Sequence, residues 1–197
     1  MQAEKSYKKF LDTAKYYLKE LDFYGKNQFK YKPTEKAWSI GQLYDHLING
    51  SYEYHLKQIE NCLQKRGGSE KGKKKFKGKI LFFLKSFPNM RISGVPATTY
   101  TPAQPESPVK VKDELYRFIK VMHQAAKDID AAGQLKYKVP HPSLGMMTAE
   151  EWYMLIEMHF RHHLKQKSRL DEIVRSYKHE EASVTPGEEQ YQESDFN

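Results

Sequence analysis

The chain has 197 residues, enough for one sizeable hydrophobic core and short for two independent domains. Hydrophobic residues make up 39% of it, and no apolar run approaches the roughly 18–20 residues that cross a bilayer, so a spanning protein is excluded and no membrane partner is expected. Cys62 is the only cysteine, which excludes an internal disulfide, and no secretory signal is visible, so we expect a cytoplasmic protein.

The net charge of +8 is unevenly distributed along the chain. Residues 180–197 hold six acidic residues and no Lys or Arg, so the preceding body carries a formal charge of +14. The acidic segment cannot bury enough apolar area to offset the entropy lost on ordering. We therefore expect a folded domain over residues 1–178 and a disordered acidic tail over residues 179–197.

Two helices are expected in the first third of the chain. Residues 4–25 place apolar side chains at helical spacing, and Gly25 follows as a stop. After an irregular link, Ser39 can cap a second helix that runs to about residue 65 and ends at a pair of glycines.

The next helix is expected over residues 108–132, where it stops at Gly133. Between the second and third helices, residues 78–87 can form a short extra helix, and the proline-rich segment 88–107 reads as a long ordered loop. With a fourth helix over residues 148–177, the pattern predicts an all-α fold, an antiparallel four-helix bundle with long connections.

The fourth helix carries three of the chain's eight histidines. Thr148 and Glu151 have the three-residue spacing of a capping box, which begins a helix. Residues four apart on a helix have Cβ atoms about 5–6 Å apart, so His159 and His163 lie on one face. At that separation two imidazoles can converge on one metal ion.

Two further observations limit this hypothesis. His162 points about 100° away from His163 and is expected to stay outside such a site. The zinc-protease motif H-E-x-x-H needs a glutamate directly after its first histidine, and Phe160 stands there, which excludes a standard metalloprotease. The pair alone leaves a second interpretation open, in which both are core or interface histidines bonded to backbone or carboxylates.

The second helix can supply a third nitrogen ligand. His46 shares a face with Gly50, which is expected to leave room for close approach of another group. His55 lies nine residues further on, about 180° round a regular helix, and is expected to point elsewhere. A site of His46, His159 and His163 would keep its fourth position for water or substrate, as catalytic zinc sites do.

Three segments of the chain resemble the DinB/YfiT-like superfamily of metalloenzymes over about residues 5–176. They are WSIGQLYDHLI at 38–48, HPSLGMMTAEEW at 141–152 and HFRHHLKQ at 159–166. The resemblance implies a three-histidine site for zinc, nickel or a similar divalent ion at His46, His159 and His163. Gln166 matches a glutamine that often follows in that family.

The resemblance implies no single reaction and assigns no catalytic residue. The family is similar in fold to thiol-dependent transferases and isomerases, which favours transfer of a low-molecular-weight thiol such as bacillithiol or mycothiol over metal-assisted hydrolysis. Candidate outer-shell groups are Asp45, Glu53 and Glu157, with Asp45 expected to face solvent. His141 is expected to be an ordinary surface histidine.

A non-enzymatic binding protein is the alternative. Residues 65–79 hold eight basic residues, one acidic residue and Phe76, which could contact nucleic acid or another anionic partner. Such a run usually forms a solvated loop, and nucleic-acid recognition motifs are absent from the sequence, so a small-molecule substrate is the expected partner. The sequence leaves open whether the chain forms a homodimer.

Overall fold

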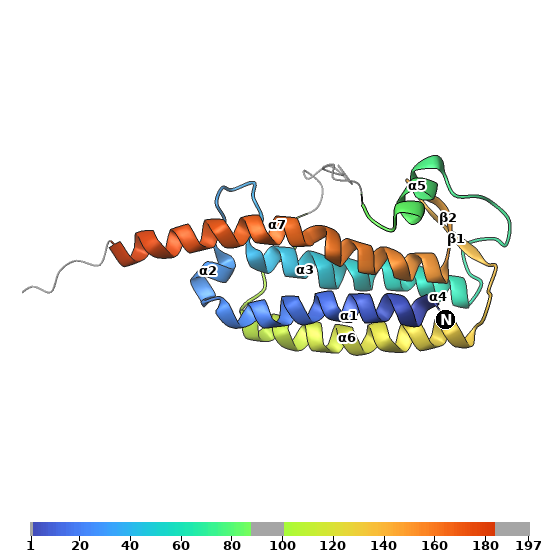
Figure 1. Ribbon diagram of the computed structural model, residues 1–197, viewed down its shortest axis with the longest axis horizontal. Helices are drawn as coiled ribbons and strands as arrows, with labels where there is room; N and C mark the ends of the chain where they lie inside the picture. The colour runs from blue at the N-terminus through green and yellow to red at the C-terminus, as the bar shows by residue number, and fades with distance from the viewer. Residues whose placement is uncertain (1, 88–100, 184–197) are drawn as a thin grey trace, which may run out of the picture.

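The structure is a computed structural model that describes residues 2–87 and 101–183. Long helices run side by side along its longest axis, with a short helix and a hairpin at one end (Figure 1). In chain order the elements are α1 (Gln2–Glu20), the 3₁₀ turn η1 (Leu21–Phe23), α2 (Lys26–Lys30), α3 (Ile40–Gly50), the π-helical turn η2 (Ser51–Leu56), α4 (Lys57–Leu63), α5 (Phe76–Leu84), α6 (Pro108–Ala131), β1 (Lys138–His141), β2 (Gly145–Thr148) and α7 (Ala149–Ser183).

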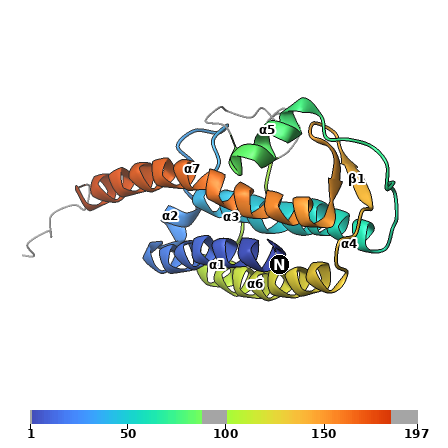
Figure 2. The same ribbon diagram turned by 45° about the vertical axis from the view of Figure 1, so that its right-hand side comes forward.

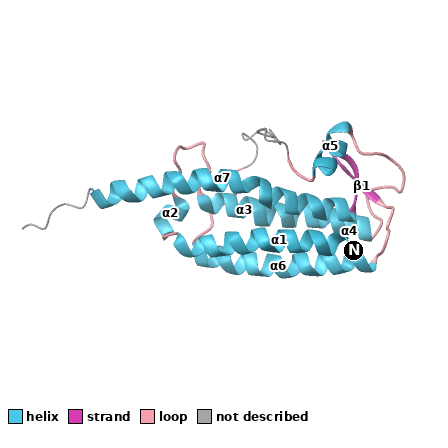
Figure 3. Ribbon diagram, in the orientation of Figure 1, coloured by secondary structure: helices cyan, strands magenta, loops and turns pink. Residues whose placement is uncertain are grey.

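The mostly helical fold confirms the all-α expectation, and the two-stranded hairpin is a small addition to it (Figure 3). Helix α1 packs against α6 and α7, and α3 contacts the same two helices. Of the helices in the described part of the chain, none combines the length and the apolar character needed to cross a membrane.

The core between the long helices is rich in aromatic side chains. Phe10 and Tyr17 of α1 meet Phe118 of α6 and Phe160 of α7, with ring centroids of the contacting pairs 5.1–5.9 Å apart. The buried Tyr17 hydroxyl donates to the backbone oxygen of Phe160 at 3.1 Å, and that of Tyr44 donates to the oxygen of Tyr17 at 2.8 Å. These bonds satisfy polar groups that burial would otherwise make costly.

Several element boundaries differ from the sequence expectation. The link after α1 contains the short helix α2, and Gly25 caps its start. The helix expected over residues 39–65 is interrupted by the π-helical turn between α3 and α4. Helix α7 continues to Ser183, past its expected end near Tyr177 and into the acidic tail. Residues 88–100 of the proline-rich loop and 184–197 of the tail lie outside the described residues.

The hairpin was not predicted, and it holds the basic loop 65–79. The loop pairs with the hairpin through two bridges, Ser69 with Lys138 and Lys74 with Gly145. Gly145 has φ +87°, and a Cβ there would lie 2.5 Å from the backbone nitrogen of Lys75, so this turn requires glycine. The short extra helix is present as α5, and it begins inside the basic loop.

Candidate metal centre

His46 is positioned by a well-capped helix start. The backbone nitrogen of Gln42 donates to Ser39 Oγ at 3.0 Å, and the Ser39 nitrogen donates to Gln42 Oε1 at 3.2 Å, a reciprocal capping box. The Gln42 side chain also donates to the backbone oxygen of Pro102 at 2.9 Å, which ties the loop before α6 to α3. The Trp38 ring, just before the cap, lies 4.9 Å from the His46 ring.

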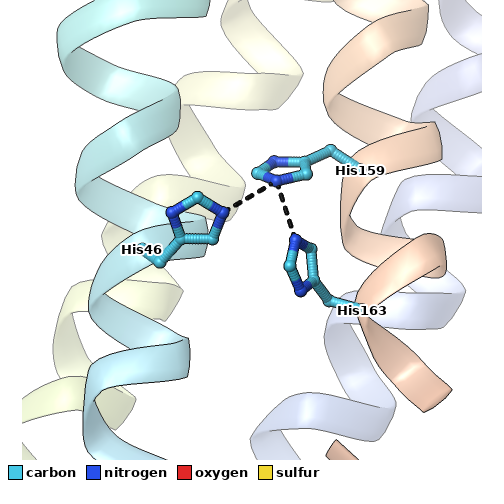
Figure 4. Close-up of side chains that lie close together, drawn as sticks. All are labelled: His46, His159 and His163. Carbon is cyan, nitrogen blue, oxygen red and sulfur yellow. Dashed lines mark hydrogen bonds between the residues drawn. The ribbon is translucent and has the colours of Figure 1, made fainter. Parts of the chain in front are cut away.

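His159 and His163 come from one face of α7. Thr148 and Glu151 form the expected capping box, with the Thr148 nitrogen donating to Glu151 Oε2 at 3.0 Å and the Glu151 nitrogen to Thr148 Oγ1 at 3.3 Å. The first turn of α7 is therefore fixed, and the two rings project one helical turn apart toward His46 on α3 (Figure 4).

The Nε2 atoms of the three histidines meet. Nε2 of His159 lies 3.0 Å from Nε2 of His46 and 3.0 Å from Nε2 of His163 (Figure 4). An imidazole nitrogen offers either one N–H or one lone pair, so the His159 nitrogen cannot make two full hydrogen bonds at once. Three lone pairs aimed at one ion satisfy all three nitrogens together. The residues present therefore fit a divalent metal with imidazole ligands.

Gln166 sets the tautomer of one ring. Its Oε1 lies 2.8 Å from Nδ1 of His163. Because an amide oxygen only accepts, Nδ1 must be the protonated nitrogen, and Nε2 keeps its lone pair for the centre. A metal-bound histidine usually has such an outer partner on its second nitrogen.

Burial keeps the three rings neutral at pH 7. It lowers the pKa of His46 from 6.5 to about 4, with a further contribution from His55. It lowers the pKa of His163 to about 3, with His46 adding to the effect. The pKa of His159 lies well below 6.5, because its ring is buried and other imidazoles surround it. Neutral imidazole is the form that binds metal.

The metal-free protein should lose stability as the pH falls from about 6.5 to about 4. In this window the unfolded chain protonates its histidines, whereas folded His46 and His163 stay neutral down to about 4 and about 3. The unfolded state therefore binds more protons, and the free energy of unfolding decreases as the pH is lowered. Urea denaturation of chelator-treated protein measures this. The His46→Gln/His163→Gln variant should show a flatter dependence, and equal slopes would contradict the expectation.

The carboxylates expected around the site have other partners. Asp45 is buried, contrary to expectation, and accepts from the Ala103 nitrogen at 2.9 Å and from Asn49 Nδ2 at 2.7 Å. The sequence did not show this burial, because the Ala103 nitrogen comes from a loop 58 residues away in the chain. Glu157 pairs with Arg161 at 2.8 Å, and Glu53 is exposed.

His55 lies beside the centre, contrary to the expectation that it points elsewhere. Its ring centroid is 5.7 Å from that of His159. The cause is the π-helical turn Ser51–Leu56, whose wider hydrogen-bonded rings shift the phase of the residues that follow. Among the described residues, the clustered ligand atoms within 4.8 Å of one another belong to His46, His159 and His163, so His55 flanks the cluster.

The remaining histidines of the motif lie outside the cluster. The His162 ring packs on Phe87 at 5.1 Å, which agrees with its expected direction. His141 Nδ1 accepts from the backbone nitrogens of Ser143 and Leu144 at 3.1 and 3.2 Å, so it stabilises the hairpin turn. Gly50 does not serve close approach, since a Cβ there would stand 3.9 Å from His46 Nδ1, an ordinary contact.

Comparison with known proteins identifies the family of the chain. Neither the curated proteins nor the solved structures include a match to the chain. A protein-family model described as the DinB superfamily matches residues 9–166, a range that begins in α1 and includes His46, His159, His163 and Gln166. The match covers most of the folded part, and the chain therefore belongs to the DinB superfamily.

Proposed function

We propose that the chain is a metal-dependent enzyme that acts on a small molecule and in which His46, His159 and His163 hold one divalent ion, zinc or nickel. The observation that carries the proposal is the meeting of three Nε2 atoms, with two of the separations 3.0 Å. This proposal includes an antiparallel four-helix bundle made of α1, α3 with η2 and α4, α6, and α7. Packing in this bundle fixes the position of α3 relative to α7, the two helices that carry the ligands.

The surroundings of the cluster suit a small organic substrate. Each of the three histidine residues keeps part of its surface exposed, although burial dominates the surroundings of their rings. Trp38 lies 4.9 Å from His46, and Phe87 lies 6.5 Å from His159, both measured between ring centroids. These two rings come from different parts of the chain and flank the cluster. Aromatic walls with a few fixed polar groups are typical of small-molecule sites.

A bound divalent ion would supply positive charge that lowers the pKa of a water or a thiol and so creates a nucleophile at neutral pH. Membership of the DinB superfamily and the resemblance to thiol-dependent transferases favour the thiol. On the protein's side, the neutral rings would offer lone pairs to the ion, and Gln166 holds the proton of His163 on Nδ1.

Metal analysis of protein purified without a histidine tag tests the proposal directly. We expect one divalent ion per chain, and we expect chelator-treated protein to take up zinc or nickel at micromolar concentration with little change in helical content, since the helices have their own aromatic core. Elemental analysis and circular dichroism measure the two quantities. Protein that contains no stoichiometric metal and takes none up would refute the metalloenzyme.

Turnover assays with a small thiol separate the two reactions, because a thiol binds an open zinc site in either case. A transferase should join the thiol to an electrophile only when the protein is loaded with metal. A hydrolase should instead cleave an activated ester in a metal-dependent way, and the thiol should inhibit that cleavage. The same assays on His162→Ala should give the wild-type result, because that ring packs on Phe87 at 5.1 Å and takes no part in the cluster.

A further inference from the structure

Helix α5 presents four large apolar side chains to solvent. Phe76 is 77% exposed, Ile80 39%, Phe83 86% and Leu84 54%. Their spacing of four, seven and eight residues from Phe76 places them on one side of the helix. A cluster of this kind differs from single exposed apolar residues, which are ordinary on protein surfaces, and it marks an interaction site.

The opposite side of α5 is fixed to the rest of the protein. Leu81 is 4% exposed, and a Cβ on Gly78 would stand 2.3 Å from the backbone oxygen of Leu144, so the helix lies directly on the hairpin turn. At its start the Lys75 nitrogen donates to Leu144 oxygen at 2.8 Å. At its end Arg161 donates to the backbone oxygen of Lys85 at 2.6 Å. The contacts with the hairpin turn and with Arg161 therefore keep the apolar side of α5 facing solvent.

Exposed lysines surround this apolar side. Lys74 is paired with Glu151, and the acidic residue of the loop, Glu70, lies 3.8 Å from Lys65. The exposed lysines in and around α5 are Lys71, Lys73, Lys75, Lys77, Lys79 and Lys85. Exposed apolar side chains that can enter the interface and lysines that attract anionic lipids are the two contributions on which binding to an anionic bilayer surface depends.

Although the lack of a spanning segment led us to expect no membrane partner, binding to a membrane surface needs no such segment. We propose that α5 and its lysines dock the protein on an anionic membrane surface, with Phe76, Ile80, Phe83 and Leu84 entering the headgroup region. The lysines complement anionic headgroups, each contributing about a fivefold gain in binding near the surface. Protruding side chains need no matching cavity in lipid, whereas a protein partner would have to supply one. The proposal does not depend on the metal centre.

Other occupants fit the surface less well. Two copies facing each other would bring lysines of the same charge together. Nucleic acid stacks on aromatic rings, and the aliphatic Ile80 and Leu84 offer no such surface. The part of the acidic tail beyond α7 starts after Ser183, roughly 33 Å along the helix from Arg161, which contacts the end of α5. About ten extended residues would be used in crossing that distance, leaving too few of residues 184–197 to cover α5.

Flotation of the full-length protein with lipid vesicles tests the proposal. We expect binding to phosphatidylcholine vesicles that contain phosphatidylserine, weak binding to phosphatidylcholine alone, and loss of binding as salt is raised. The Phe76→Ser/Phe83→Ser variant should bind roughly tenfold more weakly or worse, since both rings lose their insertion. The Lys77→Glu/Lys79→Glu variant should lose at least about 25-fold.

Matched variants away from α5 serve as controls. Phe23→Ser removes an aromatic ring that is 67% exposed in η1, the turn that precedes α2 in the chain. Helix α2 lies far from α5 along the long axis of the molecule (Figure 1). Lys120→Glu/Lys127→Glu changes the net charge by the same amount as Lys77→Glu/Lys79→Glu, but on α6. Helix α6 lies on the opposite side of the long helices from α5 in both views (Figure 1 and Figure 2). Both controls should bind vesicles as the wild type does, and circular dichroism should show all variants folded.

Several results would overturn the membrane assignment. One is an equal loss of vesicle binding in the control variants, which would show that binding depends only on the overall charge of the protein. Another is equal binding to vesicles with and without phosphatidylserine. A third is absence of vesicle binding. If the protein then binds polyglutamate or a single-stranded oligonucleotide, the partner is an acidic protein or a nucleic acid. If it binds neither, α5 is covered by another part of the chain.

Discussion

Replacing His159 with alanine should strip the protein of nearly all its bound metal. Nε2 of His159 is the central atom of the cluster, 3.0 Å from Nε2 of both His46 and His163. The loss of affinity should exceed the about 10–100-fold that follows removal of an outer-shell partner, because a direct ligand is lost. Competition with a chromogenic chelator measures the affinity.

Two further variants grade the effect. Gln166→Ala removes the acceptor 2.8 Å from His163 Nδ1 and should weaken metal binding by about 10–100-fold. His162→Ala, three residues from His159, should leave the affinity unchanged. Helical content should be the same in all three, because alanine is the best helix former and the aromatic core is untouched. Full metal retention by His159→Ala would disprove the three-histidine site.

Replacing Lys167 with methionine should cost about 3–5 kcal/mol of folding stability. Its side chain is fully buried, and Nζ donates to Glu20 Oε2 at 2.7 Å, to Asp171 Oδ2 at 2.7 Å and to the Tyr24 hydroxyl at 2.8 Å. The Tyr24 hydroxyl in turn donates to the other oxygen of Asp171. Methionine fills the space but leaves two carboxylates facing each other without a cation, and this is the source of the cost.

Urea denaturation of the metal-free protein measures this loss, with two comparisons. Lys112→Met breaks the more exposed ion pair with Asp22 and should have a much smaller effect, since exposed pairs are screened by water. The triple variant Glu20→Gln/Lys167→Met/Asp171→Leu removes all three charges and should recover most of the stability lost in Lys167→Met. A Lys167→Met variant as stable as wild type would show that the buried network contributes nothing.

Local signals in the sequence determined the helical elements and two of the three clustered histidines. The Ser39 cap and the box between Thr148 and Glu151 need only residues three apart, and both are formed as expected. His159 and His163 lie on one face of α7 for the same reason, since a spacing of four places side chains one above the other. Helix periodicity could not show how far α3 lies from α7, so the expected approach of His46 came from the placement of ligands on facing helices of a bundle and from the family resemblance.

The tertiary structure decided everything that depends on partners far apart in the chain. Lysine is ordinarily a surface residue, and the burial of Lys167 is tolerable only because Glu20, at the end of α1, and Tyr24, just after η1, reach its Nζ. The hairpin was missed because its strands are only four residues long and one contains Pro140, and its contact with the basic loop could not be read locally because the bridges join residues about 70 positions apart. His55 was misplaced because a π-helical turn shifts the helix phase without a signature in local spacing. For Lys167 and for the docking of the hairpin, the stabilising contacts come from residues far away in the chain, which local patterns do not contain.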